Sequence, residues 1–304
     1  MISILVSTYN GKKYLKQQLD SLFIQTYKKI LITVRDDGSK DITLELLKSY
    51  DVDLLESIDN LGPKNSFNTL LEYSLDSEYI MFCDQDDVWK TDKVEKTFQK
   101  MQELEKQFPH KPILVHTDLE IVDEKLKTID KSMWHYEFLN PNLNSLNRLL
   151  MQNTITGCTV MINKQLALLA LPIPVDAIMH DWWLGLVASK FGKIGFLDEA
   201  TIKYRQHNNN SIGAKGFNYL SIFLKFYKIF YKNELYLKHL RVNIKQSKAF
   251  LETYKDNLDK KTIKMLEDFT IIESQSFWQK RKILLKYKLL KQGFIRNIGL
   301  LLKI

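Results

Sequence analysis

The sequence predicts an α/β fold, in which a mostly parallel central sheet carries helices on both faces, followed by a basic helical extension. Short apolar runs alternate with helical patterns through the first hundred residues, as in parallel sheets whose strands are joined by helices. The hydrophobic content of 45% is sufficient for a buried core and excludes a disordered chain. A change of charge near residue 214 predicts two regions, a compact α/β domain over residues 1–214 and a helical tail over residues 215–304.

Each expected element follows from a local pattern. Apolar runs predict strands over residues 2–7, 30–35, 53–57, 79–83 and 113–116. Apolar residues at helical spacing predict helices over residues 14–25, 42–50, 67–74 and 88–102. A proline-containing break, Pro172-Ile173-Pro174, precedes another expected helix that begins at Asp181. The stretch Asn208-Asn209-Asn210-Ser211 is expected to end the α/β domain.

The charge is unevenly distributed. Residues 1–214 hold 24 Lys and Arg against 29 Asp and Glu, whereas residues 215–304 hold 20 against 7. A basic tail suggests an anionic partner, either nucleic acid or a membrane surface, and a solvated helix face is the alternative. No apolar run reaches the roughly 18 residues of a spanning helix, and the start lacks a signal-peptide pattern. With two cysteines in 304 residues, these features predict a cytoplasmic chain.

Polar residues follow each of the first four expected strands. The four clusters are Ser7-Thr8-Tyr9-Asn10-Gly11, Asp36-Asp37-Gly38-Ser39, residues 59–65, and Asp84-Gln85-Asp86-Asp87-Val88-Trp89. In open α/β sheets, ligands bind beyond the carboxyl ends of the strands. Any one cluster is explained by ordinary turn chemistry, but four at one edge of a sheet favour a binding site.

The cluster Asp84-Gln85-Asp86-Asp87 carries three carboxylates directly after a strand. Like charges this close need a cation or solvent. Oxygen ligands suit Mg²⁺ or Mn²⁺, which complete their coordination with substrate phosphates and waters. The alternative is that Asp86 and Asp87 cap the helix expected over residues 88–102.

Taken together, these motifs resemble family 2 glycosyltransferases of the GT-A fold. The matching stretches are Val6–Gly11, Asp36–Ser39, Phe82–Trp89, Asn153–Cys158 and His180–Trp183. Within the family, the chain is most similar to streptococcal-type rhamnosyltransferases of cell-wall and capsular polysaccharide synthesis. The features behind this closer similarity are Asp84–Trp89, His116–Leu119, Met179–Trp183 and Tyr204–Asn210.

The resemblance implies roles for residues that hold the donor. Ser7 and Tyr9 would lie on the pyrimidine base, Asp37 would accept a hydrogen bond from its N3–H, and Lys64 would sit near the base or phosphates. In the family's Asp-x-Asp motif, Asp84 would face the ribose or deoxyribose and Asp86 the metal.

The resemblance also implies residues for the transfer step. Asp181 would be the base that deprotonates the acceptor hydroxyl, and the alternative is that it only caps its helix. Arg205 would face the diphosphate, because a guanidinium matches its geometry, and His207 would complete the metal coordination. Asp118 and Trp182 are expected on the acceptor side, although a core role for Trp182 or Trp183 is an equal alternative.

The expected function is therefore a metal-dependent, inverting transfer of a sugar from a nucleotide-diphosphate donor to a lipid-linked glycan. The favoured donor is dTDP-rhamnose, and a UDP-hexose is the alternative. Residues 277–304 carry eight basic and no acidic residues among aromatic and aliphatic ones, which predicts docking on an anionic membrane at the inner face of the cell membrane. Packing against the body or in a homo-oligomer is the alternative for this tail.

Two other classes of protein fit the sequence less well. A nucleotidyltransferase is disfavoured because residues 7–13 contain a single glycine, whereas that class begins with a glycine-rich phosphate loop. A nucleic-acid-binding protein could use the basic tail. However, the acidic body would repel a phosphate backbone, and no nucleic-acid partner is expected.

Overall fold

The computed structural model describes residues 1–207 and 233–304, which divide into two compact units. The first unit comprises Met1–Glu137, Ile155–Ile173 and Met179–Lys215, and the second Phe138–Thr154, Pro174–Ile178 and Gly216–Ile304. The second unit thus takes two segments from within residues 1–214 as well as the tail. The asparagine-rich break at residues 208–211 and the aromatic stretch 219–231 lie outside the described residues.

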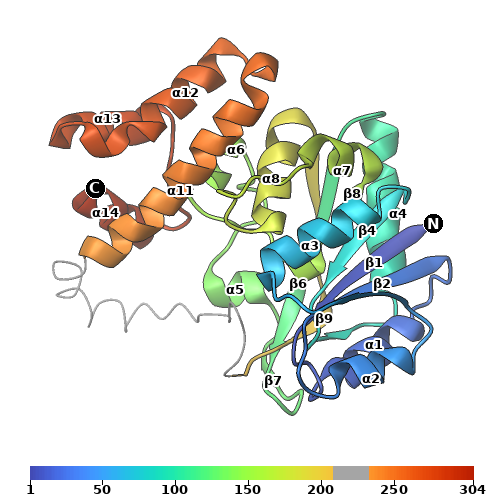
Figure 1. The fold of residues 1–304 in the computed structure, drawn as a ribbon. Helices are drawn as coiled ribbons and strands as arrows, with labels where there is room; N and C mark the ends of the chain where they lie inside the picture. Colours follow the sequence, from blue (N-terminus) through green and yellow to red (C-terminus); the bar gives the residue numbers. More distant parts are fainter. Residues whose placement is uncertain (208–232) are drawn as a thin grey trace. The chain divides into compact units, whose positions relative to one another are not determined.

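The first unit is built on a nine-stranded sheet, counted over its described residues, with the order β3-β2-β1-β4-β8-β6-β9-β5 and with β7 beside β6 (Figure 1). The strands are β1 (Ile2–Thr8), β2 (Ile30–Asp37), β3 (Asp53–Ser57), β4 (Tyr79–Cys83), β5 (Val88–Trp89), β6 (Ile113–Val122), β7 (Thr128–Asp130), β8 (Met161–Asn163) and β9 (Lys193–Arg205). Strands β3, β2, β1 and β4 are parallel, whereas β8 is antiparallel to both β4 and β6. The sheet is therefore mixed, and its parallel half contains the first four predicted strands.

Helices cover both faces of this sheet. They are α1 (Leu15–Phe23), α2 (Thr43–Lys48), α3 (Gly62–Tyr73), α4 (Lys93–Gln107), α5 (Met133–Glu137), α7 (Lys164–Ala170) and α8 (His180–Phe191). Because side chains alternate along a strand, Ile2, Ile4 and Val6 of β1 pack in one core with α1, α2 and α4. The opposite face carries α3, where Phe67 meets Phe82 of β4 with ring centroids 5.7 Å apart. Parallel strands covered in this way present their carboxyl ends at one free edge.

The predicted start of the helix over residues 88–102 is wrong. The sequence predicts a helix from residue 88, but Val88 and Trp89 form strand β5, which pairs antiparallel with β9. Helix α4 begins at Lys93, with Asp92 as its N-cap residue. Strand β9 is distant in sequence, so local periodicity could not reveal this pairing. Consequently, Asp86 and Asp87 do not cap that helix.

The second unit is helical in its described part. Its helices are α6 (Leu146–Leu149), α11 (Asn233–Tyr254), α12 (Lys260–Thr270), α13 (Phe277–Lys286) and α14 (Phe294–Lys303). The inserted segment 138–154 joins the tail through specific bonds, since the Asn147 amide donates to the carbonyls of Tyr287 and Lys288 at 3.1 and 2.9 Å. Buried Phe250, Leu266 and other apolar residues give this unit its own core. Among the described helices, none is long and apolar enough to cross a membrane.

Candidate active site

The carboxyl ends of β2, β1 and β4 lie side by side and carry three of the four polar clusters. In the register of the sheet, Val6 pairs with both Val34 and Cys83, so the residues that follow these positions leave the sheet together. The predicted meeting of Ser7, Asp37 and Asp84 at one edge follows from this parallel order. The edge is the candidate site.

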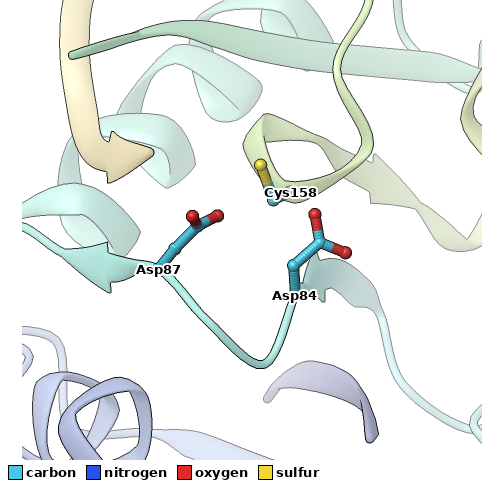
Figure 2. Close-up of side chains that lie close together, drawn as sticks. All are labelled: Asp84, Asp87 and Cys158. Carbon is cyan, nitrogen blue, oxygen red and sulfur yellow. The ribbon is translucent and has the colours of Figure 1, made fainter. Parts of the chain in front are cut away.

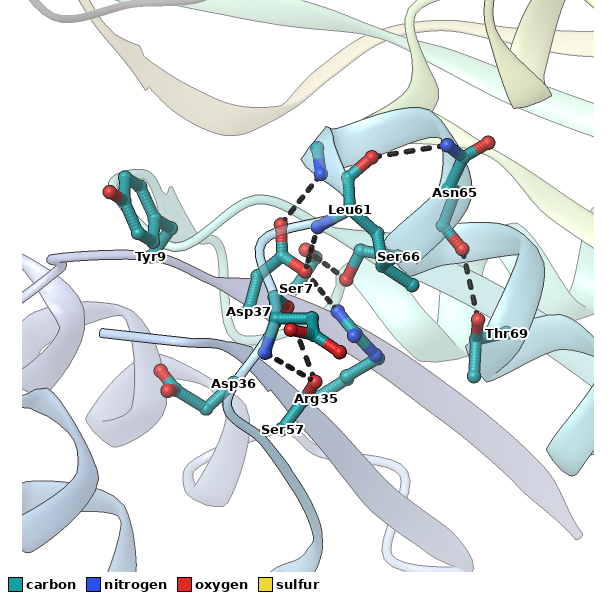
Figure 3. A network of polar contacts seen from close by, with 12 residues as sticks. Ser7, Tyr9, Arg35, Asp36, Asp37, Ser57, Leu61, Asn65, Ser66 and Thr69 are labelled. Carbon is teal, nitrogen blue, oxygen red and sulfur yellow. Dashed lines mark hydrogen bonds and ion pairs between the residues drawn. The ribbon is translucent and has the colours of Figure 1, made fainter.

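Asp37 is buried at the end of β2 and fixes the start of α3. Its carboxylate accepts hydrogen bonds from the backbone N–H groups of Leu61 and Gly62, both at 2.8 Å, and forms an ion pair with Arg35 (Figure 3). Nearby, the Ser7 hydroxyl donates to the Ser66 hydroxyl of α3 at 2.7 Å. These bonds connect the ends of β1 and β2 to one helix. The predicted contacts of Ser7 and Asp37 with a base remain predictions.

Tyr9 and Lys64 lie on the two segments that this network positions. The Tyr9 side chain follows β1 and is 42% exposed, so its ring is available to a ligand (Figure 3). Lys64 is half-buried in the first turn of α3, two residues after the bond from Gly62 to Asp37. Both positions are compatible with the donor contacts that the resemblance implies.

Asp86 and His207 meet directly. The Nε2 atom of His207 lies 2.8 Å from Oδ2 of Asp86, and the imidazole packs on Tyr14 of the loop before α1, with ring centroids 4.9 Å apart. The two residues belong to different loops, one after β4 and one after β9. The structure thus brings together the two residues predicted to hold the metal.

Arg205 is buried, and its side chain bonds groups inside the protein. Its Nε donates to the carbonyl of Asp86 at 2.8 Å, and its two terminal nitrogens donate to the carbonyl of Glu124 at 2.5 Å and to Oε1 of Gln17 at 2.7 Å. The guanidinium also lies over the Tyr14 ring, 4.4 Å from the centroid. These contacts favour a positioning role for Arg205 over the direct diphosphate contact that the sequence predicts.

A second cluster joins the loop after β4 to Cys158, which lies in the turn of residues 157–159. One ligand atom each from Asp84, Asp87 and Cys158 falls within 4.8 Å of the others (Figure 2). Burial and the neighbouring carboxylates of Asp86 and Asp181 raise the pKa of Asp84 to about 7. Burial also raises the pKa of Asp87 and that of the Cys158 thiol well above their usual ranges. A bound divalent cation would instead lower the pKa values of the Asp84 and Asp87 carboxyl groups.

The donor chemistry decides which residues suit a hard cation. A protonated thiol such as that of Cys158 is a poor ligand for Mg²⁺ or Mn²⁺, whereas carboxylate oxygen suits both metals and a neutral imidazole is a common metal ligand in proteins. Asp87 in that cluster already accepts from the backbone N–H of Arg205 at 3.0 Å. The pair of Asp86 and His207 therefore fits a metal better than the cluster around Cys158.

Asp181 lies in the first turn of α8, next to the loop of residues 84–87 that follows β4 (the carboxylate loop). The N-cap residue of α8 is Met179, and the Asp181 carboxylate accepts a bond from the N–H of Trp182 at 2.8 Å. Its charge contributes to the raised pKa of Asp84. Asp181 also lies beside Gly157, which directly precedes Cys158 of the cluster with Asp84 and Asp87. A Cβ atom at Gly157 would lie 3.0 Å from Nε2 of His180 and 3.5 Å from the Cβ of Asp181, so the His180 ring is the close neighbour that favours glycine there.

The remaining predicted residues have structural partners. Trp183 is fully buried and donates from Nε1 to the carbonyl of Ala170 at 2.9 Å, which makes it a core residue, whereas Trp182 is only half-buried. Asp118 accepts from the N–H groups of Leu119 and Trp134 at 2.8 and 3.2 Å. It also accepts from the Ser132 hydroxyl. In this structure, Asp118 holds the start of α5.

Sequence reasoning missed three residues that shape the site. Arg35 neutralises Asp37, Gln17 accepts from Arg205, and Gln85 bonds the loop after β1. Arg35 directly precedes the Asp36-Asp37 cluster, which was a usable signal. The partners of Gln17 and Gln85 lie far away in the chain, so no local pattern identified them.

Residues 3–165, more than half of the chain, match the family described as glycosyl transferase family 2. The chain belongs to glycosyl transferase family 2. This membership confirms the enzyme class that the motifs predict. Within the matched range lie the ends of β1, β2 and β4 and the loop with Asp84 and Asp86.

Relatives of this family 2 member include proteins from several bacteria. It is 25% identical over 228 residues to the dTDP-rhamnosyl transferase RfbG of Shigella flexneri, covering 69% of this chain and 74% of that one. It is 26% identical over 213 residues to the uncharacterized glycosyltransferase RT0329 of Rickettsia typhi, covering 68% of this chain. In that second match, the chain spans 64% of the length of the relative.

Solved structures share the fold of this family 2 chain. TarS residues 1–349 of S. aureus, in complex with UDP, match with a TM-score of 0.57 at 17% identity, covering 94% of this chain and 75% of TarS 1–349. The mannosyltransferase PcManGT of Pyrobaculum calidifontis, in complex with GDP-Man and Mn²⁺, matches with a TM-score of 0.53 at 14% identity, covering 99% and 78%. The predicted GT-A type of fold with C-terminal helices is thereby confirmed.

Proposed function

We propose that the chain transfers L-rhamnose from dTDP-rhamnose to a lipid-linked glycan with inversion at the transferred carbon. The observation that carries the transfer reaction is the convergence of Asp84, Asp86, His207 and Asp181 at the carboxyl edge of the sheet. Support for the sugar comes from the similarity to RfbG, which is named a dTDP-rhamnosyl transferase. A UDP-hexose is the competing donor.

Asp86 and His207 would hold the metal, Mg²⁺ or Mn²⁺. When bound there, a divalent cation supplies positive charge that stabilises the departing diphosphate. Arg205 would position both residues. Its Nε donates to the Asp86 carbonyl, and its buried side chain anchors the end of β9, two residues before His207. The buried guanidinium thus acts through the metal ligands.

Asp181 would accept the proton of the acceptor hydroxyl. As that oxygen forms a bond to the anomeric carbon of the sugar, the bond from this carbon to the diphosphate breaks, and the diphosphate leaves with the electron pair. Because attack and departure occur on opposite sides of the carbon, the base and the diphosphate-binding groups must face the sugar from opposite sides. Tyr9 and Asp37 would hold the base of the nucleotide at the ends of β1 and β2.

We also propose that the second unit docks on an anionic membrane surface, where a lipid-linked acceptor is found. Helices α13 and α14 expose large apolar side chains: Trp278 is 77% and Phe294 is 80% exposed. Residues 277–304 carry eight basic residues and no acidic one. Basic residues beside exposed aromatic ones are typical of helices that lie in a membrane interface.

The donor is tested by measuring nucleoside diphosphate release in the presence of Mn²⁺ or Mg²⁺. We expect turnover with dTDP-rhamnose to exceed turnover with UDP-glucose, UDP-GlcNAc and GDP-mannose. Asp86→Ala protein serves as the blank for contaminating hydrolases. Higher turnover with a UDP-hexose would assign that sugar in place of rhamnose. No nucleoside diphosphate release from any donor would contradict the transferase function itself.

A further inference from the structure

The middle residue of the Asp84-Gln85-Asp86 motif makes a two-way bond with the loop after β1. Oε1 of Gln85 accepts from the backbone N–H of Tyr9 at 2.8 Å, and Nε2 of Gln85 donates to the carbonyl of Tyr9 at 3.0 Å. A primary amide can both donate to and accept from one backbone residue in this way, as a neighbouring strand would. Seventy-six residues of sequence separate the two partners.

Gly11 is shaped to receive the same amide. A Cβ atom built on Gly11 would lie 2.4 Å from Oε1 of Gln85 and 3.0 Å from its Cδ. The backbone of Gly11 is outside the left-handed region, so alanine is conformationally acceptable there. The obstacle to a side chain at position 11 is therefore the Gln85 amide, which a methyl group at that position would displace from Tyr9.

The opposite side of the loop is held by the end of β2 and the residues that follow it. The N–H of Asn10 donates to the Ser39 hydroxyl at 2.9 Å, and the N–H of Gly11 donates to the Thr43 hydroxyl at 2.8 Å. The Asn10 side chain in turn accepts from the N–H of Lys40 at 2.9 Å. With Gln85 on the β4 side, the backbone is fixed from both neighbouring strands, while the Tyr9 ring stays exposed.

We propose that Gln85 is a positioning residue that fixes Tyr9 to the carboxylate loop. The bond holds the tyrosine ring and the metal ligands at the spacing that lets both contact the same nucleotide. This inference rests on the proposed function, in which the Tyr9 ring contacts the base and Asp86 holds the metal. The residue between the two aspartates thereby determines how well the base and the diphosphate of one donor are bound together. Glutamate cannot replace it fully, because a carboxylate cannot donate to the Tyr9 carbonyl.

The first test needs no nucleotide. Gln85→Met keeps the length of the side chain and removes both bonds, and Gln102→Met, at an exposed glutamine of α4, is the matched control. We expect hydrogen exchange at the Tyr9 amide to be at least about 10-fold faster in Gln85→Met, with thermal unfolding little changed. Unchanged exchange at Tyr9 would overturn the inference.

The second test measures binding of dTDP and UDP with Mn²⁺ by calorimetry. Of dTDP and UDP, one is expected to bind to the wild type. We expect the affinity of Gln85→Met for that nucleotide to be about 10-fold lower, with KM for the donor raised and kcat altered much less. Gln85→Glu should fall between the wild type and Gln85→Met in hydrogen exchange at Tyr9. Equal nucleotide affinity in wild type and Gln85→Met would overturn the inference, whereas a wild type that binds neither nucleotide would contradict the proposed function.

A rescue experiment separates the specific contact from general damage. Gly11→Ala alone should weaken nucleotide binding about as much as Gln85→Met, because the new methyl group expels the amide. In a Gln85→Ala background, the same Gly11→Ala change should cost nothing further, since the space is then free. Additive losses in the double variant would show that Gly11 serves another contact and would overturn this account.

Discussion

The imidazole of His207 lies 2.8 Å from the carboxylate of Asp86, although 121 residues separate them in sequence. Strand β9 makes this possible, because it runs back along the sheet to pair with β5 directly after the carboxylate loop. His207 follows the end of β9, and Arg205 at that end is bonded to Asp86 and Asp87. The candidate metal site therefore depends on a strand pairing as much as on its ligands.

Removal of either member of this pair should reduce metal-dependent activity. We expect Asp86→Ala to lower turnover by orders of magnitude and His207→Ala to weaken Mn²⁺ binding, because each variant loses one of the two residues assigned to the metal. Calorimetric titration with Mn²⁺ and donor turnover measure both effects, with the unfolding temperature as the check on the fold. Full activity in excess chelator would contradict the metal requirement.

Asp181→Asn should remove the proton acceptor while its shape is kept. Losses of about 10²–10⁴-fold in kcat are typical of such groups. Donor affinity should change little, because Asp181 is assigned to the acceptor hydroxyl. Asp198→Asn, at an exposed aspartate of β9, is the matched control. Transfer at the wild-type rate by the Asp181→Asn protein would assign Asp181 to the structure of α8 alone.

Arg205→Lys should destabilise the first unit despite conserving the charge. The guanidinium donates in three directions, to Asp86, Glu124 and Gln17, which one ammonium group cannot reproduce. We expect a loss of about 2–4 kcal/mol in the free energy of unfolding, measured by chemical denaturation. Lys193→Arg, at an exposed position of β9, should be nearly neutral by comparison. Wild-type stability with weakened diphosphate binding would instead support a direct contact with the donor.

Acid should destabilise the protein partly through His116. Burial among Trp134 and Phe196 lowers the pKa of His116 from about 6.5 to about 3 in the folded chain. Between these values the unfolded state binds the proton and the folded state does not, so stability falls as pH falls. The slope is about 1.4 kcal/mol per pH unit below about 6.5. Between pH 7 and pH 4, the free energy of unfolding of His116→Leu should fall less than that of the wild type. His239→Leu, at an exposed position, should lose as much stability as the wild type.

Trp278→Ser with Phe294→Ser should reduce binding to anionic vesicles. Both side chains are largely exposed, so the variant should keep its fold. Flotation with vesicles that contain phosphatidylglycerol, at low and high salt, measures the binding. Ile58→Ser, at a side chain that is 95% exposed in the first unit, is the control. Equal flotation of all variants would contradict docking through α13 and α14.

The sequence could predict the strands of the parallel half well. Strands β3 and β4 have the predicted bounds, and β4 is a short apolar run between turn residues. The clusters after β1, β2 and β4 could be assigned to one edge, since parallel neighbours present their carboxyl ends together. The start of α4 was mispredicted because β5 forms only by pairing with β9, which lies more than a hundred residues away.

The sequence by itself determined the enzyme class, since the motifs at the strand ends are local and specific. Tertiary structure decided which partners each motif residue contacts. Arg205 was predicted to face the diphosphate, but burial requires its donors to be satisfied inside the protein, which directs it to carbonyl groups and an amide. Gln85 gave no local sign of its partner, because its bond to Tyr9 exists only when β1 and β4 lie side by side.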